Sequence, residues 1–201
     1  MALVIQFVFG LVGDKIKEAE GDILTKWQRI LVGVQERLEK MLKGLEASTT
    51  DERNVALLAI KCLHELQHDA TRESVCSKFL AKRDGRLYLG KLNITPVDSG
   101  ALFEFLGNSK NLEELAFEAC TIQGDYSYSK MEKSLLSNPT NSITCLTFVG
   151  NFTDHGVKYL SEALKSKKCK LTSLDLSDNE ITDQSAEYLS EALKSENCKL
   201  S

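Results

Sequence analysis

The sequence of 201 residues predicts an α + α/β fold, in which an N-terminal helical bundle precedes a solenoid of strand–turn–helix repeats. Three observations support this. The octapeptide YLSEALKS occurs at residues 159–166 and again at 188–195, and self-similarity at a fixed period is typical of repeat architectures. A short alternation of apolar and polar residues precedes each copy. Residues 1–83 contain no proline and place apolar side chains every three or four positions, which favours helices.

Residues 1–83 are therefore predicted to form one domain of four or five packed helices, which closes the N-terminal end of the solenoid. Gly13 or Asp14 is expected to end the first helix, and Ser48–Thr50 are candidates to cap a later one. Two more helices are expected within residues 55–67 and 70–82. The helical spacing is clearest at Ile23, Leu24, Trp27, Ile30, Leu31, Val34, Leu38, Met41, Leu42 and Leu45.

The clearest repeat spans residues 171–199. The leucine-rich repeat pattern LxxLxLxxNxI is matched by Leu171, Leu174, Leu176, Asn179 and Ile181. The alternation around Asp175 predicts a short strand. Asn179 is expected to turn the chain and to bond backbone groups with its side chain. Thr182 or Asp183 is a candidate helix cap. One such unit cannot bury its apolar face alone, so neighbouring units must stack.

Residues 84–201 are predicted to hold four such units, at 84–111, 112–142, 143–170 and 171–199, and the start of a fifth. Parallel strands are expected to line the concave side and helices the convex side. Because the sequence stops two residues into the fifth unit with no polar cap, we expect a piece of a longer protein. The earlier units follow the same frame at Leu87, Leu89, Leu92, Ile94, Leu102, Phe105 and Leu106; at Leu112, Leu115, Phe117, Cys120 and Ile122; and at Ile143, Leu146, Phe148, Phe152, Val157, Leu160 and Leu164.

Each earlier unit departs from the pattern at one place. Leu92 and Cys120 stand where the last unit has Asn179. The polar insert QGDYSYSK, residues 123–130, is expected to make the start of its helix irregular. The third unit is one residue shorter, at Asn151. We expect the Asn151 side chain to be buried, which would prevent glycosylation of its NFT sequon, one of two in the chain.

Composition and motifs exclude several function classes. Residues 1–83 carry a net charge of +1 and residues 84–201 one of −5, so a nucleic-acid partner is not expected. No GxSxG or HExxH motif is present, and GLVGDK lacks the P-loop pattern. His64 and His68 can share a helical face but have no third ligand. We expect no enzyme, no cofactor and no metal.

The six cysteines lack CxxC spacing, and the N-terminal apolar run is too short to span a membrane. These features indicate a reduced, cytoplasmic protein without a membrane span.

What remains is a protein-binding surface on the outward side of the strands. The candidate partner-binding residues are Arg86, Tyr88, Glu114, Glu118, Thr147, Val149, Ser173, Asp175 and Ser177. Three of these are acids and one is a base. We therefore expect a basic partner whose binding weakens with salt. The oligomeric state is left open.

The repeats resemble the ribonuclease-inhibitor subtype of leucine-rich repeat. The helical part resembles the domain that precedes such repeats in the NACHT-containing NLR innate-immune receptors, through FVFGL at Phe7–Leu11 and CLHELQ at Cys62–Gln67. The resemblance implies an intracellular, nucleotide-switched receptor with an upstream effector domain. This chain would supply its last helical domain and the start of its sensing and autoinhibitory region. The partner would be another protein or the nucleotide-binding module of the same receptor.

Two alternatives remain open. A stand-alone leucine-rich binding protein similar to ribonuclease inhibitor, directed at a basic enzyme, would also fit the acidic repeat half. A secreted repeat protein would require disulfides among the six cysteines.

Overall fold

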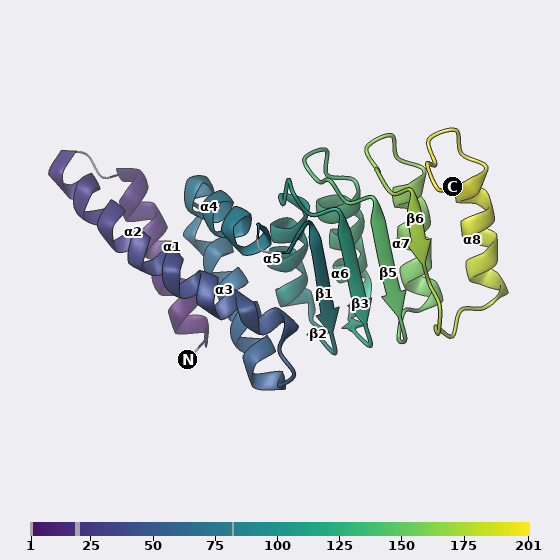
Figure 1. The fold of residues 1–201 in the computed structure, drawn as a ribbon, viewed down its shortest axis with the longest axis horizontal. Helices are drawn as coiled ribbons and strands as arrows, with labels where there is room; N and C mark the ends of the chain where they lie inside the picture. The colour runs from purple at the N-terminus through teal and green to yellow at the C-terminus, as the bar shows by residue number, and fades with distance from the viewer. Residues whose placement is uncertain (1, 19–20, 82) are drawn as a thin grey trace. The chain divides into compact units, whose positions relative to one another are not determined.

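The computed structural model describes residues 2–18, 21–81 and 83–201, and it divides the chain into two compact units, Met1–Lys82 (unit 1) and Arg83–Ser201 (unit 2) (Figure 1). Each unit is described by itself. The side chains of residues 2–4, 7 and 21–28 lie outside the description, and with them the predicted apolar positions at Ile23, Leu24 and Trp27.

The described residues of unit 1 form helices joined by short turns. Its α-helices are α1 (Ala2–Glu18), α2 (Gly21–Leu42), α3 (Thr50–Leu66) and α4 (Asp69–Leu80), with a 3₁₀ turn, η1 (Lys43–Glu46), after α2. A buried cluster joins Ile16 of α1, Leu31 of α2 and Leu66 of α3. The four helices agree with the number expected from the apolar spacing.

The expectation that Gly13 or Asp14 ends the first helix is wrong. Helix α1 continues through both residues to Glu18. A Cβ atom at Gly13 would lie 2.0 Å from the carbonyl oxygen of Leu66, so glycine here allows the backbones of α1 and α3 to touch. Gly13 is a packing residue and not a helix breaker.

The start of α3 is fixed by side chains. The hydroxyl of Thr49 accepts a hydrogen bond from the Glu52 amide, as expected for a cap within Ser48–Thr50. Arg53, which is buried, donates to the carbonyl oxygens of Ala47 and Ser48 at 2.8 and 2.9 Å. These bonds hold the turn between η1 and α3.

Unit 2 alternates parallel strands with helices. A four-stranded parallel sheet has the order β1 (Arg86–Gly90), β3 (Glu114–Glu118), β5 (Cys145–Val149) and β6 (Ser173–Asp175). A second parallel pair is formed by β2 (Asn93–Ile94) and β4 (Thr121–Ile122). The helices are α5 (Pro96–Gly107), α6 (Gly124–Lys130) with a π-helical turn η2 (Met131–Leu136), α7 (Asp154–Leu164) and α8 (Asp183–Leu193).

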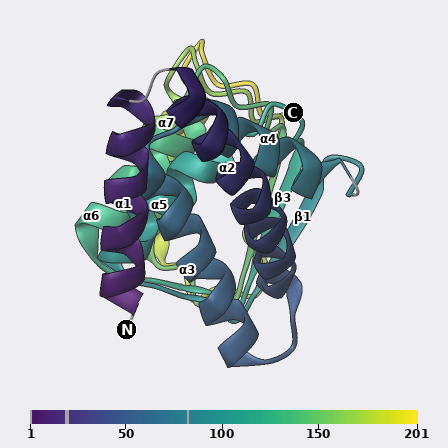
Figure 2. The ribbon, with the colours of Figure 1, turned by 90° about the vertical axis from the view of Figure 1, so that its left-hand side faces the viewer.

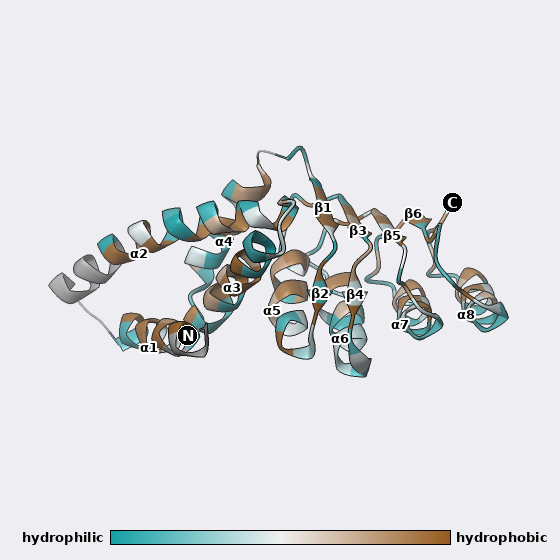
Figure 3. Cartoon of the chain, turned by 90° about the horizontal axis from the view of Figure 1, so that it is seen from below, coloured by the Kyte–Doolittle hydropathy of each residue, from teal (hydrophilic) through white to brown (hydrophobic). Residues whose placement is uncertain are grey.

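Within unit 2 the strands form one layer and the helices the other. Figure 2 looks along the row of strands and shows β1 and β3 on one side and α5, α6 and α7 on the other. The apolar faces of α7 and α8 turn toward the strands (Figure 3). The core between the layers contains Leu87, Leu115 and Leu146 in one register row.

Aromatic rings extend this core along the next inward row. Phe117 and Phe148, which are register partners, stack with centroids 4.8 Å apart, and Phe152 stacks on Phe148 at 4.0 Å. Stacked and offset pairs add to the stabilisation from burial alone.

Two details of the repeats differ from expectation. The polar insert of residues 123–130 is helical, because Gly124–Lys130 is α6, and the irregular part is the π-helical turn that follows. Asn151 is exposed at φ +77°, and Phe152 is buried in its place. The missing residue in this unit brings the ring of Phe152 inward, so burial of Asn151 does not prevent modification of its sequon.

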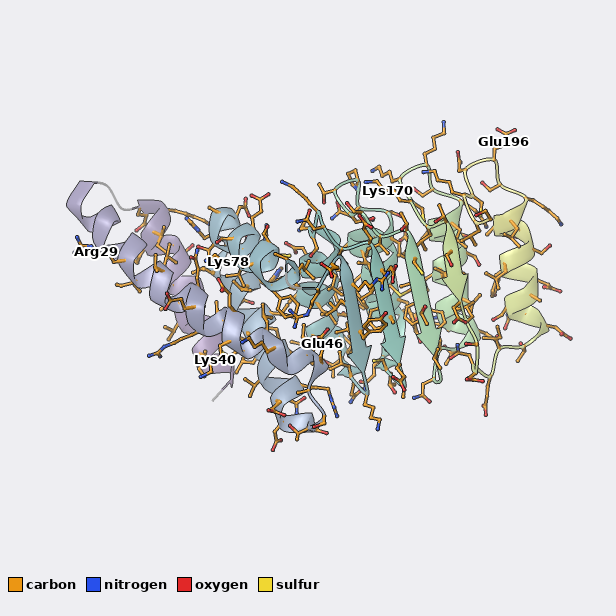
Figure 4. The ribbon with its side chains drawn as sticks, viewed as in Figure 1. Arg29, Lys40, Glu46, Lys78, Lys170 and Glu196 are labelled. Atoms are coloured by element: carbon orange, nitrogen blue, oxygen red, sulfur yellow. The ribbon has the colours of Figure 1, made fainter. Side chains whose placement is uncertain are left out.

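The loops that follow α7 and α8 lie at one edge of unit 2, where Figure 4 labels Lys170 and Glu196. The Nζ atom of Lys170 donates to the carbonyl oxygens of Pro139 and Asn141. Lys199 repeats this contact on the carbonyl oxygen of Cys169 at 2.8 Å. The lysines at these two positions therefore link neighbouring repeats.

Candidate functional site

The outward side chains of β1, β3, β5 and β6, with Ser177 beyond β6, form a surface that we call the strand face. The sheet register arranges it in rows. One row is Arg86, Glu114, Cys145 and Ser173; the next is Tyr88, Ala116, Thr147 and Asp175; the third is Gly90, Glu118 and Val149. The parallel register thus brings eight of the nine candidate residues onto the sheet itself. Neighbouring strands are about 4.8 Å apart, so each row is a nearly continuous line of side chains.

The two charged residues of the first row neutralise each other. The Nε atom of Arg86 lies 3.0 Å from a carboxylate oxygen of Glu114. Both side chains are largely open to solvent, so the pair adds only about 0–1 kcal/mol to stability. Its main effect is on charge, because Glu114 does not act as a free acid. The sequence predicts three acids and one base on the strand face. In the described part of the structure, Glu118 and Asp175 are the two of these acids that have no basic side chain paired with them.

Asp175 is held by the turn that follows β6. Its carboxylate accepts a hydrogen bond from the Ser177 amide at 2.9 Å. This bond and a further one from the Ser177 hydroxyl lower the pKa of Asp175. The negative charge at this end of the strand face therefore persists into mildly acidic solution.

Tyr88 is the most prominent apolar group of the strand face. Tyr88 is 60% exposed, and its neighbours on this face are small: Gly90 along the strand and Ala116 across it. Tyrosine combines a large apolar ring with a hydroxyl group, and it is enriched among residues that contribute most to protein interfaces. Thr147 and Val149 are half-buried and extend the shallow surface beside it.

Strands β6 and β3 are each held to the preceding repeat by a side chain behind the turn that follows them. The Nδ2 atom of Asn179 donates to the Phe148 carbonyl at 2.7 Å, and its Oδ1 atom accepts from the Phe152 amide at 2.9 Å. Cys120 makes the equivalent contacts two interfaces earlier, with the carbonyl of Leu89 and the amide of Leu92. Asn179 and Cys120 therefore help to fix the distance between the strands of the repeats that they join.

A carboxylate between helices holds the last two repeats together, and the sequence analysis missed it. Asp154 at the start of α7 accepts hydrogen bonds from the amide and the hydroxyl of Thr182, both at 2.8 Å, and from the hydroxyl of Ser185. The bond from Ser185 and those from Thr182 lower the pKa of Asp154. The signal available in the sequence was the Thr-Asp dipeptide, which occupies the same place in the last two repeats, at residues 153–154 and 182–183.

His64 and His68 do not share a helical face, contrary to expectation. Helix α3 ends at Leu66, and Gln67 takes up a left-handed conformation with φ 48°. His68 instead caps α4, where its Nδ1 atom accepts from the Thr71 amide at 3.2 Å. Among residues 2–18, 21–81 and 83–201, no group of three His, Cys, Asp or Glu side chains is placed to hold a metal ion.

The cysteines and the helices add two further observations. All six cysteines are free thiols, of which Cys62, Cys76, Cys120 and Cys169 are buried. No helix in the described part of the chain is both long enough and apolar enough to cross a membrane.

A comparison with models of protein families finds a match within unit 2. A family model described as a leucine-rich repeat matches residues 167–190, a segment that contains β6 and the first two turns of α8. A search among curated proteins finds no match to the chain. Leucine-rich repeats commonly serve in protein–protein interaction. The chain therefore carries a leucine-rich repeat at residues 167–190, within a region where parallel strands alternate with helices.

Proposed function

We propose that unit 2 is a protein-binding module that docks its partner on the strand face and performs no catalysis itself. The observation that carries this proposal is the exposed Tyr88 beside a row of small and half-buried side chains, with Glu118 and Asp175 nearby. Solenoids of stacked repeats present extended surfaces of this kind to partners. The unpaired carboxylates favour a partner that presents Lys or Arg.

We further propose that the chain belongs to an intracellular, cytoplasmic NLR-type receptor, as part of its sensing and autoinhibitory region. Two short boxes support this, FVFGL and CLHELQ. They lie on α1 and α3 and pack on each other: a Cβ at Gly10 would lie 3.8 Å from the Glu65 carbonyl oxygen, and Phe9 contacts the cluster that contains Leu66. Phe7 lies outside the described side chains. The partner of the strand face would then be another protein or the receptor's own nucleotide-binding module.

The receptor proposal is tested on the transcript. A reading frame upstream of Met1 that encodes a Walker A motif supports it. A transcript without such a module contradicts it and favours the stand-alone binding protein, to which the net charge of −5 on residues 84–201 points.

The binding proposal is tested by quantitative co-purification with the full chain. The variant Tyr88→Ala with Glu118→Lys changes the strand face, whereas Tyr126→Ala with Glu187→Lys makes the same changes on α6 and α8. Tyr126 is 53% exposed, and Glu187 is also exposed. We expect the first variant to lose its partners and the second to keep them. Equal retention by both variants would refute binding through the strand face.

A further inference from the structure

The turn between η1 and α3 carries three exposed hydroxyl residues next to a buried arginine. Ser48, Thr49 and Thr50 follow one another in this turn, and all three are exposed. Arg53, in the first turn of α3, is only 7% exposed. Its Nη1 atom donates to the carbonyl oxygens of Ala47 and Ser48, and its Nη2 atom lies 3.2 Å from the hydroxyl oxygen of Thr50. The guanidinium group therefore joins three residues of the turn.

The positive charge of Arg53 has no counter-ion among the described residues. Its hydrogen-bond acceptors are two backbone carbonyls and one hydroxyl, all of them neutral. No described carboxylate forms an ion pair with it, and its Nε atom is buried without a hydrogen-bond partner. Burial of a cation costs free energy unless an opposite charge compensates it. An anion beside Thr50 would supply that charge.

The three hydroxyl groups are not equivalent. The hydroxyl of Thr49 accepts from the Glu52 amide and donates to the Glu52 carboxylate at 2.6 Å, so a phosphate on Thr49 would meet that carboxylate. Arg53 binds the backbone carbonyl of Ser48 and not its hydroxyl. Thr50 brings its hydroxyl oxygen to the guanidinium group, and it is the first residue of a 17-residue helix. The N-terminus of a helix favours negative charge.

We propose that Thr50 is a phosphorylation site whose phosphate group pairs with Arg53 and fixes the start of α3. The Thr50 hydroxyl oxygen attacks the γ-phosphorus of a nucleoside triphosphate that a protein kinase holds. The bond from that phosphorus to its bridging oxygen breaks, a nucleoside diphosphate leaves, and the hydroxyl proton passes to a base of the kinase. The phosphate adds a charge of about −2 and three acceptor oxygens next to the atom that Nη2 already contacts. Arg53 then has a counter-ion.

Two acidic residues near Thr50 oppose this pairing, and they also indicate the class of kinase. Asp51 and Glu52 follow Thr50, and both are exposed. Water and salt screen their repulsion of a phosphate, whereas the attraction of the buried Arg53 is screened much less. The Glu52 carboxylate is also held by the Thr49 hydroxyl. Acidic residues directly after the acceptor hydroxyl suit a kinase whose substrate site is basic.

The first test asks whether the modification occurs. The protein is isolated from its native cells with phosphatases inhibited, and trypsin releases residues 44–53 as one peptide. Fragment masses distinguish phosphate on Ser48, Thr49 and Thr50. We expect a fraction of the peptide to carry phosphate on Thr50 and to lose it on treatment with a phosphatase. An unmodified peptide, or one modified only at Ser48 or Thr49, would overturn the proposal.

The second test asks whether the phosphate pairs with Arg53. Phosphothreonine is incorporated during translation of the full chain at position 50, or at position 49 as the matched control on the same helix terminus. Titration by phosphorus NMR should give a lower second phosphate pKa at position 50, because the charge of Arg53 favours the dianion. Amide exchange in the first turn of α3 should slow about tenfold with phosphothreonine at position 50, and less with it at position 49.

The variant Arg53→Gln separates the ion pair from the effect of the helix terminus. It also removes bonds of the turn, so threonine and phosphothreonine at position 50 are compared within the same variant. In Arg53→Gln the phosphate pKa at position 50 should return to the value at position 49. If this variant does not fold, the comparison of positions 50 and 49 in the native background decides. Equal phosphate pKa values at the two positions, or a difference that survives Arg53→Gln, would contradict the pairing.

Discussion

The Asp154 carboxylate binds the first turn of the next repeat's helix, with the Thr182 amide and hydroxyl each 2.8 Å from its oxygens. Asp154 and Thr182 are 28 positions apart, so the contact exists only because the two repeats are stacked in register. A charge-assisted bond of this kind is stronger than one between neutral groups.

Loss of this carboxylate should loosen α8. We expect Asp154→Ala to lower the melting temperature and to speed amide exchange in α8 more than in α5. Asp183→Ala is the matched control, because both acids stand at the first position of a helix and interact equally with its dipole. Equal effects of the two variants would show that the contact with Thr182 contributes nothing.

The same contact gives a pH dependence. The pKa of Asp154 is lower in the folded chain than in the unfolded chain, so the unfolded chain binds the proton more readily. The stabilisation is complete above the ordinary aspartate pKa and is lost as the pH falls through the lowered value. We expect α8 exchange, corrected for intrinsic rates, to rise with acidification in the native chain. In Asp154→Ala this acid-dependent rise should be smaller.

Truncation of the equivalent leucines in the two octapeptides should distinguish a helix that the next repeat covers from one that no described element covers. Leu164→Ala removes a buried side chain and should cost about 2–5 kcal/mol of unfolding free energy. Leu193→Ala, the same change at an exposed position, should stay within about 0.5 kcal/mol. Chemical denaturation measures both. A similar cost for both would mean that α8 is covered in solution.

These contrasts also show what the sequence could predict. The period, the inward leucines and the helix caps at Thr49 and Thr182 follow from local patterns, because each depends on a few neighbouring residues. The burial of Phe152 in place of Asn151 does not follow from a local pattern, because a one-residue deletion allows either side chain to face the core. The Arg86–Glu114 pair required the register between strands, which the sequence does not state.

The role of Gly13 could not be predicted from the sequence either, because it depends on a contact between segments that are distant in the chain. Gly13→Ala would drive a methyl group into the Leu66 carbonyl, so we expect a loss of about 1–3 kcal/mol and a lower melting temperature for unit 1. Gly33→Ala in α2 is the control, since beyond its chain neighbours and the backbone of its own helix no described atom lies within 4 Å of the position that a Cβ would take. That change should stabilise the helix by about 0.5–1 kcal/mol. A neutral Gly13→Ala would contradict the close approach of α1 and α3.

The thiols should react in an order set by burial. Burial raises the pKa of Cys62 to about 11, with a smaller opposing effect from Lys61. It raises the pKa of Cys169 as well. We expect iodoacetamide at pH 8 to label Cys145 and Cys198, which are half-buried, before Cys62 and Cys169. Mass spectrometry of tryptic peptides gives the order, and early labelling of Cys62 would contradict the packing of α3.

The most direct measurement of the central claim is site-specific photo-crosslinking on the strand face. A photoreactive phenylalanine replaces Thr147, in the middle row, or Glu187 on the exposed side of α8. Each full-length protein is irradiated in cells, and adducts are resolved by mass. We predict a discrete adduct from position 147 that Tyr88→Ala abolishes, and none of that mass from position 187. The same adduct from both positions, or from position 187 alone, would contradict binding through the strand face.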